Sequence, residues 1–333
     1  MNSAWTEFTQ NRSLAPLDVS TLSNTAILAP CGDDAILKVS GSDATEFLHG
    51  QLSSDVKNLQ VGSSQLSSYS SPKGMVYSHC RLYKLSNDEC LLRLPRSLTV
   101  SVGKRLKMFV LRAQVEITVD ESVGVLLLAG SEASALTPLC DDLPDTPDHF
   151  SQSEHSIALK LPDIQRENGS LPYYEVVLSN EHLSTAWKTL TQTHLACDPS
   201  TADLLRILSG EPHLSPSTTE QFVAQNLNLH LNGGISFKKG CYPGQEYIAK
   251  TQYRGRLRSQ LFRLTGETEL EPGAALYSNP DSNTEIGTVL KSAWDGQSYQ
   301  TTAVLRLKAT ESGTVYTGDN SECAVHTPTY SGQ

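Results

Sequence analysis

The pattern of apolar residues changes near residue 259, and this change constrains the fold more than any other feature of the sequence. Before it, strand-like and helix-like segments alternate in two similar series. After it, short alternating segments separated by turn residues run to the end of the chain, which is typical of a small β-barrel or sandwich. A chain of 333 residues is also too long for one small core. We therefore predict an α+β protein with subdomains at 1–122 and 123–258 and a C-terminal β domain at 259–333.

Each α+β series gives explicit element predictions from its periodicity. The first series predicts strands at 35–41, 65–71, 74–86, 89–95 and 115–120. It also predicts helices that begin near 43 and near 97. The second predicts a strand at 123–131, a helix-compatible segment at 132–140, an acidic surface loop at 141–148, strands near 156–161 and 173–179, and helices at 180–190 and 200–210. Asp43 and Glu46 have the spacing of a capping box, and Gly210 is placed to end the last helix.

The charge and hydropathy of the chain narrow the function classes. A formal net charge of −10 argues against an extended nucleic-acid surface, because phosphate contacts need lysine and arginine. No apolar run approaches the roughly 20 residues of a membrane helix. The first residues lack the basic and apolar regions of a secretion signal, so we expect a cytoplasmic protein without a membrane partner.

The seven cysteines are scattered without a C-x-x-C pair. In a reducing compartment such cysteines are mostly small buried apolar residues, and their spacing predicts no metal site. Cys241 is the exception because of its neighbours. It lies in "KKGCYPGQE", and seven basic residues but only one acidic residue occur between 238 and 263. That local basic cluster suits an anion such as a carboxylate or a phosphate.

Glycine and proline around Cys241 predict a tight turn. Gly240, Pro243 and Gly244 disfavour both a helix and a central strand. The ammonium group of Lys239, if close, would lower the pKa of the Cys241 thiol, and the thiolate is the form that attacks electrophiles, binds metals or exchanges disulfides. The residues alone leave an alternative open, in which Cys241 is buried and inert beside a structural turn.

The same segment resembles the K-G-C-Y-x-G-Q-E signature of the YgfZ family of folate-binding proteins, and every fixed position matches. Three further segments fit the family in the same order. Residues 47–56 resemble its F-L-x-G-Q-x-T-x-D-V helix, residues 71–85 its K-G strand entry, and residues 206–212 the R-x-x-x-G-x-P segment shared with the T-protein of glycine cleavage. The resemblance thus spans nearly the whole chain.

This resemblance implies an aminomethyltransferase-like (T-protein-like) fold, with two interlocked α+β domains around a central cavity that binds tetrahydrofolate and a C-terminal β-barrel. It implies an accessory protein for the assembly or repair of iron–sulfur enzymes, with an indirect effect on tRNA modification. The implied partners are iron–sulfur client enzymes such as radical tRNA-methylthiolation enzymes. A transient iron–sulfur cluster is a second candidate cofactor, and a non-enzymatic role is favoured over catalysis.

The resemblance also suggests roles for individual residues. Cys241 is the candidate reactive group, with Lys239 shaping its surroundings. The candidate folate contacts are Tyr242, Gly244, Gln245, Glu246, Arg254 and Arg258. The arginines suit the glutamate tail of folate, although a solvated face or interdomain ion pairs would explain them equally. Ala35 and Ala202 stand where some relatives carry tryptophans thought to line the folate site.

Two other functions remain open from the sequence. An aminomethyltransferase would need a carboxylate beside the folate nitrogen, and no aspartate is identified for that role. A tRNA-binding module would use the basic segment, but the net charge and the scarcity of aromatic residues among the basic ones disfavour it.

Overall fold

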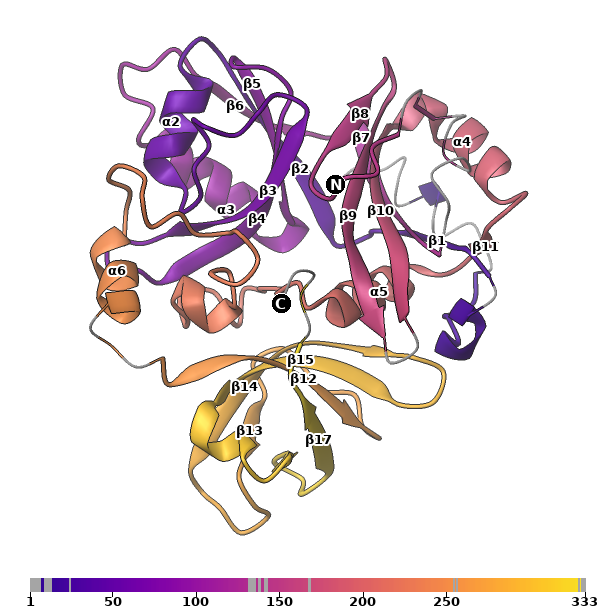
Figure 1. The fold of residues 1–333 in the computed structure, drawn as a ribbon, viewed down its shortest axis with the longest axis vertical. Helices are drawn as coiled ribbons and strands as arrows, with labels where there is room; N and C mark the ends of the chain where they lie inside the picture. The colour runs from indigo at the N-terminus through magenta and orange to yellow at the C-terminus, as the bar shows by residue number, and fades with distance from the viewer. Residues whose placement is uncertain are drawn as a thin grey trace.

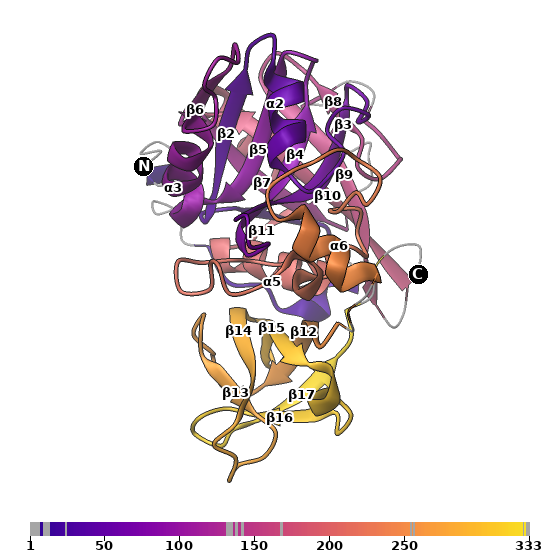
Figure 2. The same ribbon diagram turned by 90° about the vertical axis from the view of Figure 1, so that its left-hand side faces the viewer.

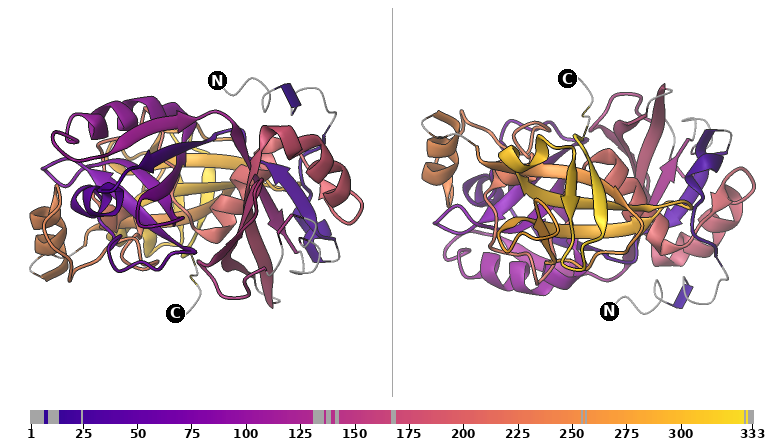
Figure 3. Two further views of the ribbon diagram at one scale, coloured as in Figure 1. Left: turned by 90° about the horizontal axis from the view of Figure 1, so that it is seen from above. Right: turned by 90° about the horizontal axis from the view of Figure 1, so that it is seen from below.

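The computed structural model describes residues 7–8, 14–23, 25–130, 136, 139–140, 143–166, 169–253, 255, 257–328 and 330. It contains two α+β halves that lie side by side, with a β-barrel across the base of both (Figures 1 and 3). The predicted α+β fold class with a C-terminal barrel is therefore confirmed. The predicted segment 132–140 lies mostly outside the described residues.

The first half is built on a five-stranded antiparallel sheet in the order β3–β4–β5–β2–β6. Its strands are β2 (Asp34–Ser40), β3 (Ser63–Ser70), β4 (Val76–Lys84), β5 (Glu89–Pro95) and β6 (Glu116–Asp120). Its helices are α2 (Ala44–Gln51) and α3 (Arg96–Lys107). Helical spacing after Ser97 predicts buried positions at Leu98, Val102, Leu106 and Phe109; the first three are buried against the core of this half, whereas Phe109 lies beyond the end of α3 and is exposed.

The second half is built on a six-stranded sheet in the order β11–β1–β7–β10–β9–β8. Its elements are β1 (Ile27–Pro30), β7 (Val123–Ala129), β8 (Phe150–Gln152), β9 (Ser156–Arg166), β10 (Gly169–Ser179), α4 (Leu183–Leu190), β11 (Leu195–Ala196) and α5 (Pro199–Ser209). Helix α5 has the signals that the sequence suggested. The Asp198 carboxylate accepts the amide N–H groups of Ser200 and Thr201, and Gly210 ends the helix at φ 73°.

The two halves exchange segments. Strand β1 pairs with β7 in the second sheet, whereas β2 follows after only three residues and pairs with β5 and β6 in the first. Residues 27–30 of the segment 1–122 thus belong to the second sheet. Conversely, Leu214, Leu227 and Ile248 from the segment 123–258 pack in the core of the first half.

The C-terminal strands close into a barrel in the order β12–β15–β14–β13–β16–β17. They are β12 (Ser259–Gly266), β13 (Ala275–Tyr277), β14 (Glu285–Trp294), β15 (Tyr299–Arg306), β16 (Thr314–Tyr316) and β17 (Glu322–His326). Strands β14 and β15 pack against α5. There Lys291 bridges Asp33 and Asp203 at 2.7 and 2.8 Å, which fixes the barrel to the two halves.

Two local predictions need correction. The Asp43 carboxylate does not cap α2; it accepts the backbone N–H of Gln114 at 2.7 Å instead, because the turn before β6 lies beside it. Helix α6 (Gln245–Tyr253) begins directly after Gly244, where the sequence suggested only a turn. Figure 2 shows α6 on the same face of the molecule as α2 and α3.

Candidate functional site

Lys239 anchors residues 239–246, which we call the signature loop, to the first half. Its ammonium group donates hydrogen bonds to the carbonyl oxygens of Leu52 at 2.7 Å, of Ser54 at 3.0 Å and of His49. The His49 carbonyl lies in the last turn of α2 and the other two follow it, where unpaired carbonyls and the helix dipole favour a cation. Burial lowers the pKa of Lys239 to about 8, partly opposed by the Asp55 carboxylate. The ammonium group is therefore directed into the protein interior.

Gly244 brings the loop against a second signature segment, the S-P-K-G turn at 71–74. Gly244 has φ 85°, and a Cβ atom there would lie 2.7 Å from both the Gly74 Cα and the Ser71 carbonyl oxygen. Gly74 in turn has φ 78° and leaves room for Tyr247, the third residue of α6. The glycines of both segments are thus required for one close backbone contact.

The rest of the signature loop divides into buried and exposed residues. Tyr242 is buried in the core of the first half, which raises its pKa to about 12, and its ring lies 4.8 Å from the Lys239 ammonium group. Gln245 is half-buried and reaches the Lys239 carbonyl oxygen at 3.4 Å. Cys241 and Glu246 are exposed. The loop is therefore held from inside and presents Cys241 to solvent.

Cys241 differs from every other cysteine of the chain, because the other six are buried. Cys241 is therefore not buried, which contradicts that part of the alternative, while its reactivity stays a prediction. Within the described residues, no three His, Cys, Asp or Glu side chains come together as ligands for a metal ion. Of the predicted arginines, Arg254 lies outside the described residues and Arg258 is exposed.

A cavity of about 300 Å³ lies between the two sheets. Leu66 and Arg81 come from the first sheet, Leu161 and Tyr173 from the second, and the Leu231–Gly233 segment, which precedes the signature loop, completes the wall. Tyr330 closes the cavity from the C-terminal tail, where its hydroxyl group accepts a hydrogen bond from Asn228 at 3.0 Å. None of the described residues predicted as folate contacts lines this cavity. Neither do Ala35 and Ala202, although Ala202 borders a smaller hollow of about 160 Å³.

Three residues of the cavity wall each carry a buried polar atom that lacks a hydrogen-bond partner among the described residues. These atoms are the Nε of Arg81, the hydroxyl oxygen of Tyr173 and the Oδ1 of Asn232. Buried polar atoms are normally satisfied, so unpaired ones around a cavity indicate a site for a polar ligand or for ordered water. Burial also raises the pKa of Tyr173, so the Tyr173 hydroxyl group is a neutral donor and acceptor.

A buried cluster of charges lies beside the cavity, and one of its members, Glu211, lines the cavity wall. Arg206 donates to Glu175 at 3.0 Å and to Glu211 at 2.9 Å, and Arg93 donates to Glu175 at 3.0 Å. Asp34 accepts a further bond from Arg206. The five side chains come from both sheets, from α5 and from the segment after it, so they tie the two halves together. We call Asp34, Arg93, Glu175, Arg206 and Glu211 the charge cluster.

The charge cluster fixes the protonation state of its cavity-lining member. Burial raises the pKa of Glu211, but the guanidinium groups of Arg93 and Arg206 outweigh burial and hold that pKa well below its usual range. Both guanidinium bonds end on Oε1 of Glu211. The Glu211 carboxylate is therefore ionised on the cavity wall, with Oε2 left to accept from a ligand.

The sequence analysis missed this cluster, although a signal for it was present. Arg93 stands in the apolar strand "CLLRLP", and Glu175 stands in "YYEVVLS". A charged residue inside such a run is buried only when it has a partner.

Two aspartates, Asp148 and Asp163, also lie on the cavity wall. The sequence analysis identified neither of them as a candidate carboxylate for aminomethyl transfer. Asp148 is paired with Arg81 at 2.6 Å, and Asp163 is paired with Lys160. Both carboxylates are therefore already neutralised by a cation.

The residues of the cavity fit a pterin. A pterin ring has a flat apolar face and an edge of N–H donors and ring acceptors. Leu66 and Leu161 provide apolar surface, whereas Glu211 accepts and Arg81 donates. The mixture of apolar walls with a few convergent polar groups is typical of a small-molecule site.

Comparison with solved structures identifies the class of protein that this fold defines. The aminomethyltransferase T of the glycine cleavage system from Bartonella henselae matches with a TM-score of 0.74, over 91% of this chain and 85% of that chain, at 16% identity. The chain therefore has the fold of the glycine-cleavage T-protein, as predicted. A scan against models of known protein families finds no match.

Comparison with curated sequences identifies the family. The tRNA-modifying protein YgfZ of Edwardsiella ictaluri is 32% identical over 241 residues, which are 72% of this chain and 71% of that protein. The protein of the same name from Colwellia psychrerythraea is 30% identical over 233 residues, 70% of this chain and 69% of that protein. The chain belongs to the YgfZ family, which confirms the resemblance. No helix in the described part of the chain has the length and apolar character needed to cross a membrane.

Proposed function

We propose that this protein binds tetrahydrofolate in the central cavity and supports iron–sulfur enzymes that act in tRNA modification, with Cys241 as its reactive group. A cavity of about 300 Å³ in a T-protein fold supports this proposal most directly, because three of its wall residues carry a buried polar atom without a described partner. The curated relatives are named tRNA-modifying proteins, which supports the tRNA-modification part.

The cavity residues would hold the pterin ring. Glu211 would accept from its N–H groups, the Arg81 Nε would donate to a ring acceptor, and Tyr173 and Asn232 would complete the edge. Tetrahydrofolate carries one-carbon units on its N5 and N10 nitrogens. In this assignment Lys239, Tyr242, Gly244 and Gln245 hold the signature loop in place, and they do not contact the pterin ring.

Tyr173→Phe provides a test of the ligand site that leaves the fold intact. The Tyr173 hydroxyl group has no hydrogen-bond partner in the described protein, so removing it leaves the free energy of unfolding unchanged or slightly higher. If a pterin ring uses this hydroxyl group, its loss weakens tetrahydrofolate binding by about 1 to 1.5 kcal/mol, or roughly tenfold in Kd. Calorimetric titration of wild type and variant with tetrahydrofolate measures the difference.

Tyr83→Phe is the matched control. The Tyr83 hydroxyl group donates to Glu175 and does not line the cavity, so this variant should lose stability and keep its affinity. No heat of binding with the wild-type protein, or equal affinities for wild type and Tyr173→Phe, would remove the cavity from the proposal.

The exposed thiol supports the second part of the proposal. Cys241 lies in a loop that Lys239 and Gly244 fix to the first half, so the sulfur atom is presented at a constant position on the surface. A partner protein can therefore reach it without unfolding any element. An iron–sulfur cluster bound at Cys241 would take its other ligands from that partner, because the remaining cysteines are buried.

Cys241→Ser tests this part in cells that lack the wild-type protein. We expect methylthiolated tRNA to fall to the level of cells without the protein, while the abundance of the variant stays normal because the site is exposed. Cys80→Ala is the control, since burial raises the pKa of the Cys80 thiol to about 12 and makes it inert. Full rescue by Cys241→Ser would contradict a chemical role for the thiol.

A further inference from the structure

Helix α3 and the turn that follows it expose four large apolar side chains. Val100 is 58% exposed, Met108 62%, Phe109 47% and Leu111 87%. These four are among only ten large hydrophobic residues that are exposed within the described residues, and they fall within twelve positions. Exposed apolar side chains that are concentrated in one segment indicate an interaction surface, whereas singly scattered ones do not.

Positive charge surrounds this apolar surface. Lys104, Lys107 and Arg112 are exposed, Arg105 lies beside them, and no acidic residue occurs from 90 to 115. None of these four cations forms an ion pair with a described residue, whereas Lys38 and Lys57 elsewhere on the first half are paired with glutamates. In a chain of net charge −10, the segment is a local basic region.

The segment is held rigidly in its exposed position. The Arg105 guanidinium group stacks over the Tyr77 ring at 3.8 Å, and Val110 packs against the core of the first half. The backbone N–H of Gln114 is fixed by the Asp43 carboxylate at 2.7 Å. Leu111 has φ 46°, a backbone conformation that costs free energy for leucine, and this conformation leaves its side chain in solvent. Because the turn is anchored, the exposed Leu111 side chain is already held in a position from which a partner can bury it.

We propose that this region, which we call the α3 surface (Val100, Lys104, Lys107, Met108, Phe109, Leu111 and Arg112), is a docking site for a protein partner whose contact segment is acidic around an apolar centre. The apolar side chains would be buried at the centre of the interface, and the cations would pair with carboxylates at its rim. The proposal goes beyond folate binding and does not depend on it, because the α3 surface contributes no residue to the central cavity.

The chemistry of the surface favours a protein over the two other anionic partners. A nucleic acid would use the cations and one ring for stacking, but exposed Leu111, Met108 and Val100 offer nothing to phosphates or sugars. An anionic bilayer presents charge across a wide area and would repel the rest of a chain of net charge −10. An acidic patch of limited size on a partner protein would contact only this basic region, and it would not be repelled by the acidic remainder of the chain.

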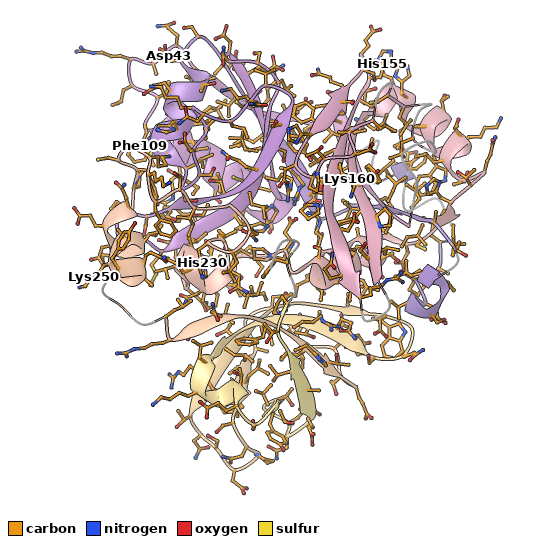
Figure 4. All side chains as sticks on the ribbon, viewed as in Figure 1. Asp43, Phe109, His155, Lys160, His230 and Lys250 are labelled. Atoms are coloured by element: carbon orange, nitrogen blue, oxygen red, sulfur yellow. The ribbon has the colours of Figure 1, made fainter. Side chains whose placement is uncertain are left out.

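The position of the α3 surface suggests how a docked partner would lie. Helices α2, α3 and α6 face the same side of the molecule (Figure 2). Phe109, which follows α3, and Lys250, which belongs to α6, both lie toward that side (Figure 4). The Cys241 loop immediately precedes α6. A protein bound at the α3 surface would therefore lie on the side of the molecule that carries α6, the helix that begins four residues after Cys241.

Photo-crosslinking tests this proposal with the full-length chain in its own cells. With benzoylphenylalanine at position 111, we expect one discrete protein adduct, whose crosslinked peptide contains more acidic than basic residues and at least one large apolar residue. Lys104→Glu combined with Lys107→Glu, in a chain with the same crosslinker, should reduce the adduct by about tenfold, because the steering charges are reversed. The free energy of unfolding of that variant should fall by no more than about 1 to 2 kcal/mol, because neither lysine pairs with a described residue and only the favourable interaction with the C-terminal end of α3 is reversed.

Two controls and a direct measurement complete the experiment. The same crosslinker at Val61, which is 55% exposed outside the α3 surface, should not give this adduct. The captured protein, once purified, should bind wild type more weakly as salt increases. An adduct with RNA, lipid or a second copy of this chain, a basic crosslinked peptide, or no adduct would each overturn the proposal.

Discussion

Replacement of Arg206 by methionine is expected to lower the free energy of unfolding by about 3 to 5 kcal/mol. Arg206 is buried and donates to Asp34, Glu175 and Glu211. Without it, three carboxylates of the charge cluster face the single guanidinium group of Arg93 in an interior that solvates charge poorly. A buried ion pair adds little stability compared with apolar residues of the same shape, but the loss of one partner leaves an uncompensated charge.

The pH dependence of this effect has a defined sign. In the wild type the pKa of Glu211 lies below its value of 4.5 in an unfolded chain, so this carboxylate stabilises the fold above pH 4.5 and loses that contribution as the pH falls. Removing Arg206 removes part of the contribution. The difference between wild type and variant should therefore be largest near pH 7 and shrink in acid.

Urea unfolding at several pH values measures this difference. Lys38→Met is the control, because the ion pair of Lys38 with Glu89 is about one-third exposed and such pairs contribute at most about 1 kcal/mol. If Arg206→Met stays within about 1 kcal/mol of wild type at pH 7, the charge cluster does not hold the two halves together.

Gly244→Ala is the second substitution with a large expected effect. It should lower the free energy of unfolding by about 2 to 5 kcal/mol. The backbone at φ 85° is strained for alanine by about 1 to 3 kcal/mol. The added methyl group would also lie 2.7 Å from the Gly74 Cα and from the Ser71 carbonyl oxygen, and overpacking against rigid backbone costs a similar amount. The expected result is a marked loss of stability together with displacement of the Cys241 loop, measured by urea unfolding and by the alkylation rate of the thiol.

Gly240→Ala is the matched control from the same loop. Gly240 is exposed, and a Cβ atom there would meet nothing within 4 Å, so its effect on stability should stay within about 0.5 kcal/mol. Equal effects of the two substitutions would mean that the contact between the signature loop and the 71–74 turn does not carry the strain that its geometry indicates.

Local periodicity predicted most of the elements but little of the site. The strands of the first sheet, strands β7, β9 and β10 of the second and helix α5 follow from alternation and from capping residues, because those signals act over a few positions. The short strands β1, β8 and β11 were not predicted. Helix α6 was missed since its nine residues have only one buried position, Ile248. A helix with so narrow an apolar face resembles a polar loop in sequence.

Contacts between distant segments were not available from the sequence. Lys239 was predicted to act on the neighbouring thiol, yet the structure directs its ammonium group to carbonyls almost 190 positions away. The charge cluster likewise joins Asp34 to Arg206 across both halves. Spacing along the chain cannot reveal such partners, although a lone charge inside an apolar strand indicates that one must exist.

The exchange of segments between the two halves has a consequence for biosynthesis. The last strand of the first sheet ends at residue 120, but its core also requires Leu227, Leu229 and Ile248. The apolar faces of β3, β4 and β5 therefore leave the ribosome well before the residues that cover them. A nascent chain in this state is prone to aggregation, so we expect chaperones to hold it until about three quarters of the polypeptide has been made.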